Sequence, residues 1–390
     1  MKRVVLFFAR DILPVSTGTG RAVYALAEHL NSLPDVDLTL VTIDMRGCKL
    51  DREKYKDLCS RIVVLDPPKR WGVLDILNKI TARIGIPIVA SWFWGIALRR
   101  EFTEICVDAD AVIINYGMFA SLLPREIRKN KAVVVTHDIM FYRLASKYRA
   151  WVSAAVWIWF NRIVELRVLR SFLKIGVFGE YEREILERQG IGRSRIVCLG
   201  MPISVKRYGG PKVDFKYDFL LTCSAFRQNE DGVRCFFERV APLLRNRSKV
   251  TLGVAGAICR SPVWDAVEVP ANFQVERLGY VEDLAKTFAQ SVVAIGTLPW
   301  GSGIKLKVVE AIFHGKPVVV TNSGIEGIPN LPIATLNVDI CEPERTATIL
   351  NEWLDNPEEA AARGLEQAKF LELKFSPDVA LRELRKTIGV

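Results

Sequence analysis

Glycine, lysine and glutamate are concentrated in one part of the second half of the chain, in an arrangement that suits a phosphate-containing ligand. Gly301 and Gly303 come after an apolar run and before a helical pattern over 304–314, so a ligand could approach the backbone closely there. The spacing predicts that the N–H groups of Gly303, Ile304 and Lys305 open this helix. Such unpaired N–H groups form an anion site that the helix dipole favours.

Glu310, Lys305 and Lys307 extend this candidate site. Glu310 comes seven residues after Gly303, which on a helix is almost two turns and about 10 Å along the axis. This separation would place a diphosphate at the helix end and a ribose diol beside the carboxylate. Lysines at a helix N-terminus oppose the dipole, and a bound phosphate would account for them. Two solvated lysines and a glutamate on an exposed helix face, where replacement costs little stability, fit the spacing equally well.

Two weaker candidates lie in the first half. His137 ends the apolar run 132–136, where its imidazole could donate a hydrogen bond to a leaving group or a hydroxyl, although a structural histidine is the alternative. Gly18 and Gly20 follow the first apolar run, 3–9, but the third glycine of a dinucleotide fingerprint is missing at Val23. A tight turn before a helix over 21–33 is therefore the alternative there. His29 and His314 are expected to be structural.

Short β-branched runs alternate with helical patterns along the whole chain, which predicts parallel sheets covered on both faces. The alternation restarts after a polar stretch at 200–216. We therefore predict two doubly wound α/β domains, over 1–205 and 206–373, with a last helix in 374–390 that packs back towards the first domain. In the first domain, a long apolar and basic helical stretch is expected over 146–173.

The net charge of +10 comes from two stretches. Segments 69–100 and 143–174 together hold 13 basic and 2 acidic residues, which leaves 41 bases and 42 acids elsewhere. Six of the nine tryptophans accompany these bases, a composition typical of a helix that lies on anionic lipid. Buried helices with snorkelling arginines are the alternative. Nothing else in the chain is typical of a nucleic-acid-binding module, so nucleic acid is not expected as a partner.

The remaining composition argues against several other classes. The longest apolar run, 84–98, is shorter than the roughly 20 residues that a membrane span needs, and it contains Pro87. The apolar run after Met1 is too short for a signal peptide. The eight cysteines show neither a C-x-x-C pair nor zinc spacing, and we expect them to be reduced in a cytoplasmic protein without a metal site.

The motif-bearing segments resemble one enzyme family. Gly-x-Gly-x-Lys-x-Lys at 301–307, Glu-Ala at 310–311, Gly-x-Pro-Val-Val at 315–319 and Thr-x-x-Gly-x-Glu-Gly at 321–327 are similar to the donor-binding segment of family 4 (group 1) glycosyltransferases of the GT-B fold. Residues 221–232, with Asn229 and Gly232, resemble the opening of that family's second domain. Residues 278–284 are similar to its nucleotide-base loop.

This resemblance implies two Rossmann-like domains that face a central cleft, the first on the acceptor side and the second binding a nucleotide sugar. It also implies transfer of a sugar from a UDP- or GDP-sugar with retention of configuration and without a required metal. We expect a glycan or lipid-linked cell-envelope acceptor, and a protein attached peripherally to the inner face of the membrane through 69–100 and 143–174. A GT-B nucleotide-sugar epimerase and a non-catalytic, membrane-bound GT-B partner are the alternatives.

By the same resemblance, His137, Lys305 and Glu310 would be catalytic. The residues expected to bind the donor are Gly18, Gly20, Arg227, Gly279, Tyr280, Val281, Ser302, Gly303, Ile304, Lys305, Lys307 and Glu310. The chain departs from the family pattern at three places: Ser302 stands where many members have glutamate, Cys223 replaces a glycine, and the usual Arg and Lys after the first strand of the second domain are absent. Arg227 is near enough in sequence to substitute for them.

Overall fold

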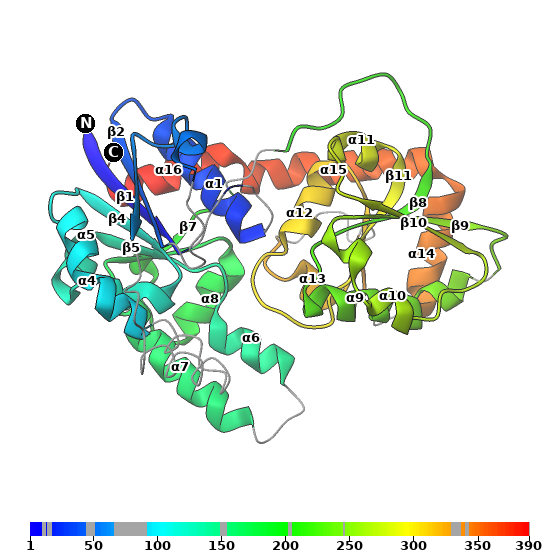
Figure 1. Cartoon of the computed structure of the whole chain (residues 1–390). Helices are drawn as coiled ribbons and strands as arrows, with labels where there is room; N and C mark the ends of the chain where they lie inside the picture. The colour runs from blue at the N-terminus through cyan, green and yellow to red at the C-terminus, as the bar shows by residue number, and fades with distance from the viewer. Residues whose placement is uncertain are drawn as a thin grey trace. The chain divides into compact units, whose positions relative to one another are not determined.

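The computed structural model describes residues 1–9, 13, 18–43, 51–65, 92–148, 154–201, 205–244, 246–328, 337–339 and 343–389. It divides the chain into two compact units, Met1–Ile203 with Phe375–Val390, and Ser204–Lys374 (Figure 1). These limits lie within two residues of the expected ones. Residues 69–91 and 149–153 of the basic stretches lie outside the described residues. Within the described ranges, no helix combines the length and apolar character that crossing a membrane requires.

The first unit is built on a seven-stranded parallel sheet with the order β3-β2-β1-β4-β5-β6-β7. Strand β1 is buried from Val4 onward, because helices cover both faces of the sheet. The order reverses between β1 and β4, and ligands of doubly wound sheets bind at the carboxyl ends of strands at such a point. The strands are β1 (Lys2–Phe8), β2 (Val36–Ile43), β3 (Arg61–Leu65), β4 (Ala111–Asn115), β5 (Ala132–Val135), β6 (Lys174–Val177) and β7 (Ile196–Cys198).

The helices of the first unit connect successive strands, and the last one returns from the end of the chain. They are α1 (Gly18–Asn31), α4 (Trp92–Val107), α5 (Arg125–Lys131), α6 (Met140–Lys147), α7 (Ala155–Leu169), α8 (Glu180–Arg188) and α16 (Pro377–Ile388). As expected, α16 packs on this unit, against α1 and β7. Within the helical stretch expected over 146–173, the structure has the end of α6 and the whole of α7 as separate elements. Short 3-10 helices include Gly117–Leu122 after β4.

The second unit contains a six-stranded parallel sheet with the order β10-β9-β8-β11-β12-β13, which reverses between β8 and β11. Its strands are β8 (Tyr217–Thr222), β9 (Val250–Ala255), β10 (Phe273–Gly279), β11 (Ser291–Gly296), β12 (Val318–Val320) and β13 (Asn337–Asp339). Its helices are α9 (Arg227–Arg239), α10 (Val263–Ala266), α11 (Leu284–Ala289), α12 (Leu306–Phe313), α13 (Asn322–Ile325), α14 (Pro343–Asp355) and α15 (Pro357–Phe375). The two outermost strands, β10 and β13, are not among the strands that the sequence pattern predicts.

Candidate functional site

In the second unit, the glycine-rich loop joins β11 to α12 at the point where the strand order reverses. The helix begins at Leu306, with Lys305 at the N-cap, so the prediction that Gly303 and Ile304 belong to its first turn is wrong. The reason is conformational, because Gly301 (φ 146°) and Gly303 (φ 72°) have backbone angles that an α-helix cannot contain. The first N–H groups of the helix therefore belong to Leu306 and Lys307.

The later start also shortens the distance along the helix to Glu310. This residue is four positions after Leu306, one turn or about 6 Å along the axis, instead of the expected 10 Å. Its carboxylate is buried, at 7 % exposure, and Lys305 is 8 % exposed. The interpretation of both as exposed surface residues is therefore wrong, because the apolar side of α12 packs under the loop. Ser302 is buried beside them.

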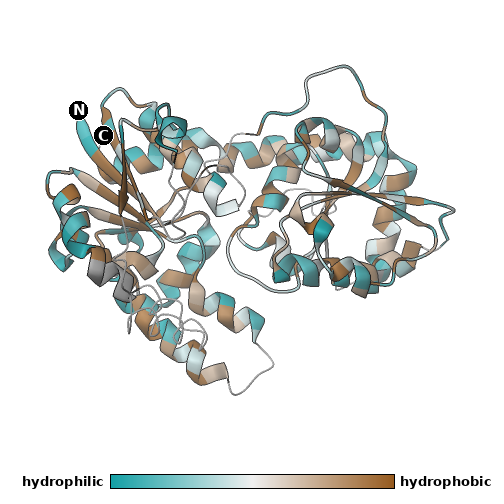
Figure 2. Cartoon of the chain, viewed as in Figure 1, coloured by the Kyte–Doolittle hydropathy of each residue, from teal (hydrophilic) through white to brown (hydrophobic). Residues whose placement is uncertain are grey.

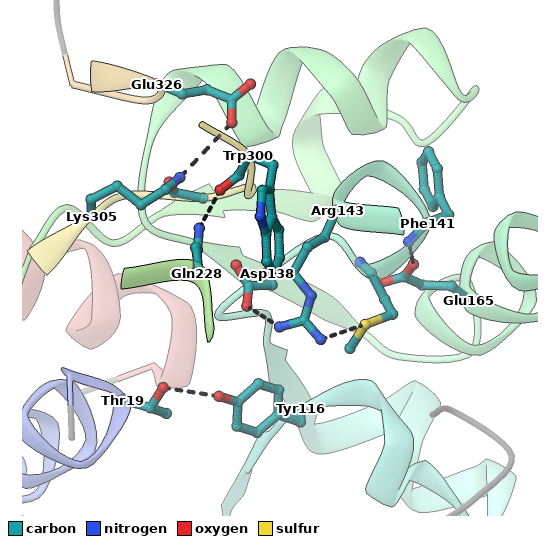
Figure 3. A network of polar contacts seen from close by, with 12 residues as sticks. Thr19, Tyr116, Asp138, Phe141, Arg143, Glu165, Gln228, Trp300, Lys305 and Glu326 are labelled. Carbon is teal, nitrogen blue, oxygen red and sulfur yellow. Dashed lines mark hydrogen bonds and ion pairs between the residues drawn. The ribbon is translucent and has the colours of Figure 1, made fainter. Parts of the chain in front are cut away.

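Helix α9 holds the glycine-rich loop in place. Gln228 Nε2 donates a hydrogen bond to the Trp300 carbonyl at 2.5 Å (Figure 3). Trp300 Nε1 in turn donates to Asp231 Oδ2 at 3.0 Å. A Cβ on Gly301 would lie 2.0 Å from Gln228 Nε2, so a side chain there would displace this amide from the Trp300 carbonyl. A Cβ on Gly232 would lie 2.1 Å from the Thr297 carbonyl oxygen. The resemblance at Gly232 thus has a packing reason.

The two lysines of the loop have different partners. Lys305 Nζ donates to the Gly303 carbonyl and lies 4.0 Å from Glu326 Oε2, so a carboxylate balances its charge (Figure 3). Lys307 Nζ instead donates to the neutral amide oxygen of Asn229 at 2.9 Å. Burial lowers the pKa of Lys307, because its charged form is poorly solvated there. Lys307 is therefore the better placed of the two to receive an anion.

The other predicted donor residues of this unit lie at the carboxyl ends of neighbouring strands. Arg227 is the first residue of α9, directly after β8, and is exposed. Gly279 ends β10 with a φ of 68°, and Tyr280 is 89 % exposed beyond it. Ile304 and Val281 are half-buried. The sheet order places β8 beside β11, so Arg227 follows the strand next to the loop, and 279–281 follow the outer strand β10.

In the first unit, His137 follows β5 and bonds to the strand beside it. Its Nε2 lies 2.8 Å from Asn115 Oδ1, and Asn115 Nδ2 donates to the Phe7 carbonyl at 2.9 Å. The bond to Phe7 turns Nδ2 of Asn115 away from His137, so Oδ1 faces the ring. Because an amide oxygen can only accept, His137 Nε2 must donate, and the ring is the Nε2–H tautomer. Nδ1 then carries a lone pair and can accept a hydrogen bond. The prediction that this imidazole donates to a sugar or leaving group does not fit this tautomer.

Aromatic rings hold the His137 ring from both sides. The ring centroids of Tyr116 and Phe178 lie 4.6 and 5.1 Å from that of His137. Burial lowers the pKa of His137 to about 3, so the ring is neutral at physiological pH. We therefore expect no activity inflection near pH 6.5 from this residue.

Tyr116 has an unusual backbone for a residue with a side chain, with a φ of 70°. Its hydroxyl lies 3.0 Å from Thr19 Oγ1 in the first turn of α1 (Figure 3). Gly18 and Gly20 lie inside α1, beside this contact. The expectation that they form a loop before the helix is wrong. Asn115 and Tyr116 are not among the predicted site residues. Their position at the end of an apolar run is the sequence signal that could have identified them.

A buried carboxylate fixes the start of α6, just after His137. Glu165 on α7 accepts hydrogen bonds from the Met140 and Phe141 N–H groups, both at 2.9 Å (Figure 3). Asp138 and Arg143 form an ion pair at 3.1 Å on the same turn. Burial raises the pKa of Glu165 to about 7, although the two N–H groups and Arg143 favour its charged form.

Glu165→Gln should change the pH dependence of stability. The pKa of this carboxyl is 4.5 when unperturbed and about 7 in the fold, so between these values the folded state binds the extra proton. The contribution of Glu165 to the free energy of unfolding therefore falls as pH rises through this window, by about 3 kcal/mol in all. In urea unfolding, the free energy of unfolding of the variant relative to that of the parent should be higher at pH 8 than at pH 5. Glu126→Gln, which changes an exposed carboxylate on α5, is the control; equal behaviour of the two variants would contradict the raised pKa.

The fold of the two units is the GT-B fold of glycosyltransferases. The solved structure of sucrose-phosphate synthase from Thermosynechococcus elongatus matches with a TM-score of 0.72 at 15% identity, over 99% of this chain and 98% of that one. HepE from Anabaena, in complex with UDP and glucose, matches at 0.65 and 12% identity over 100% of both chains. A mutant of S. aureus TarM, in complex with Fondaparinux, α-GlcNAc-glycerol and UDP, matches at 0.68 and 11% over 100% of both.

At the level of sequence, residues 218–356 match the family model of glycosyl transferases group 1. This part contains the glycine-rich loop, Lys305, Lys307 and Glu310. No curated protein sequence matches the chain.

Proposed function

We propose that this protein is a retaining glycosyltransferase of family 4, which transfers a sugar from a UDP- or GDP-sugar to a glycan or lipid-linked acceptor without a required metal. The observation that carries the proposal is the loop before α12 at the reversal of the second sheet. It combines the first N–H groups of α12 with a half-buried lysine, Lys307, whose hydrogen-bond partner is a neutral amide. A diphosphate there would supply the missing negative charge. HepE and TarM, which share the fold, were solved with UDP.

In this mechanism the protein stabilises the departing diphosphate. The N–H groups of Leu306 and Lys307 and the Lys307 ammonium would face the phosphate oxygens, and the exposed Arg227 would add charge. Lys305 would hold the loop in its conformation and would not contact the phosphates itself, because Gly303 and Glu326 already bind its ammonium. Glu310 would accept hydrogen bonds from the ribose hydroxyls, and residues 279–281 would frame the base.

In the first unit, His137 would take part through Nδ1. As the neutral Nε2–H tautomer, it would accept a hydrogen bond from a hydroxyl of the sugar or the acceptor and orient it for transfer. Asn115 would hold this tautomer and Tyr116 would hold the ring plane. The acceptor itself is proposed to be lipid-linked or part of the cell envelope, with the protein at the cytoplasmic face of an anionic membrane.

Lys305→Ala and Glu310→Ala should each weaken binding of UDP- or GDP-sugars about tenfold, or about 1.4 kcal/mol: the first because the loop loses the lysine that holds it through Gly303 and Glu326, the second because a charged hydrogen bond to the ribose is lost. Both side chains are buried, so each variant should also lose about 1–3 kcal/mol of stability. Isothermal titration calorimetry on folded protein separates these effects. Lys286→Ala, an exposed lysine of α11, is the matched control.

Unchanged affinity in both variants would refute the donor site. If the parent binds a nucleotide sugar and converts it without an acceptor, the epimerase alternative holds instead. Binding without any turnover would favour a non-catalytic partner. Release of nucleoside diphosphate that depends on an added acceptor is the expected result.

A further inference from the structure

A hollow of about 640 Å³ lies on the helical surface of the first unit, away from the carboxyl ends of the strands. Four of its side chains are arginines, none is acidic, and its apolar part consists of an indole, an isoleucine and a leucine. The lining residues come from the start of α5, from α7 and the turn after it, and from the end of α8: Arg125, Trp159, Arg162, Ile163, Leu166, Arg167, Arg170, Ser171 and Gln189. This composition suits an anion that carries an apolar group.

Helix α7 continues the hollow as an exposed apolar surface. Trp159 and Ile163, which line the hollow, are 59% and 45% exposed. Val156, Trp157 and Phe160 are exposed on the same helix, and Figure 2 shows apolar colouring along α7. The burial of large apolar side chains is the usual state in a folded protein, and an exposed group of five beside arginines indicates a binding surface.

The arginines of the hollow are poorly neutralised by the protein. Among the described residues, neither Arg162 nor Arg167 forms an ion pair, and the acid that α7 contributes, Glu165, points inward to α6. Arg170 Nη2 donates to the Gln189 carbonyl at 2.7 Å, which fixes one wall. Guanidinium groups match the oxygens of a phosphate in a fork geometry, which lysine does not.

We propose that this hollow binds the phosphate headgroup of an anionic phospholipid, while Trp157, Trp159 and Phe160 enter the interfacial layer of the bilayer. Tryptophan beside arginine is typical of that layer. The proposal rests on the membrane attachment proposed above. It assigns that attachment to one defined site instead of the two long stretches 69–100 and 143–174. A free phosphate would make no apolar contact with the rings of Trp157, Trp159 and Phe160, so the proposed occupant is a lipid and not a soluble anion.

The test compares vesicles of phosphatidylcholine with vesicles that also contain phosphatidylglycerol, in flotation at low salt. The parent should bind only the anionic vesicles, and Trp fluorescence should shift to the blue on binding. Arg162→Gln combined with Arg167→Gln should weaken this binding about thirtyfold, since each basic residue near such a surface is worth about 1 kcal/mol. Both side chains are exposed, so the double variant should remain folded.

The matched control is Arg239→Gln with Lys249→Gln, which removes the same charge from exposed positions of the second unit. This control variant should lose less than threefold in affinity for the anionic vesicles. Equal losses in the two double variants would overturn the site and leave only general attraction by charge. Equal binding to both kinds of vesicle, no binding to either, or full competition by glycerol phosphate or an oligonucleotide would also overturn it. Because no step of this test uses a nucleotide sugar, its failure is distinct from failure of the proposed transfer reaction.

Discussion

His137→Ala should lower kcat for sugar transfer about 100-fold, while affinity for the nucleotide sugar changes less than twofold. The loss is of the size found for a group that positions a reacting hydroxyl. The histidine belongs to the first unit, whereas the proposed contacts to the diphosphate, ribose and base of the donor are made by the second. An interaction made only in the transition state lowers kcat and kcat/KM together. Steady-state kinetics with donor affinity by calorimetry would measure both. His29→Ala, on α1, should leave both unchanged, because His29 bonds to its own helix at Ala25.

Asn115→Asp tests whether the tautomer matters. A carboxylate at this position would accept from Nε2–H and favour the imidazolium, so the pKa of His137 should rise from about 3 towards neutrality. The variant should then acquire a kcat inflection that the parent lacks, and imidazole 15N shifts should show protonation of Nδ1. A pH profile identical to that of the parent would remove Asn115 from the positioning role, whatever happens to the rate.

Gly301→Ala should lower nucleotide-sugar affinity about 100-fold. A side chain at φ 146° costs about 1–3 kcal/mol of strain, and the new Cβ would push Gln228 away from the Trp300 carbonyl. The loop would then no longer present the start of α12 in its present position, and about 2.7 kcal/mol of affinity is a factor of 100. Calorimetry with the donor, after a check of folding by circular dichroism, measures this.

The control is Gly209→Ala, where a Cβ would meet no atom within 4 Å. That variant should bind the donor like the parent. If Gly301→Ala also binds normally while remaining folded, the loop adapts freely and does not form the donor site.

The order of strands and helices was largely predictable because a parallel sheet buried on both faces leaves a continuous apolar run for each strand. The runs 3–9 and 132–136 became β1 and β5 within one residue. The sequence pattern does not predict β10, for the opposite reason. As an edge strand it exposes Gln274, Glu276 and Arg277, so its apolar signal is broken.

The same contrast applies to the candidate site. The sequence by itself determined that Gly301, Gly303 and His137 follow strands, because strand ends and glycine patterns are local features. It did not determine that Lys305 and Glu310 are buried, or that Asn115 sets the tautomer of His137 from 22 residues away. Nor could it show that Arg125 of α5 and Arg167 of α7 line one hollow. Only the packing of helices on the sheet decides these, because contacts between distant residues depend on which face of each element turns inward.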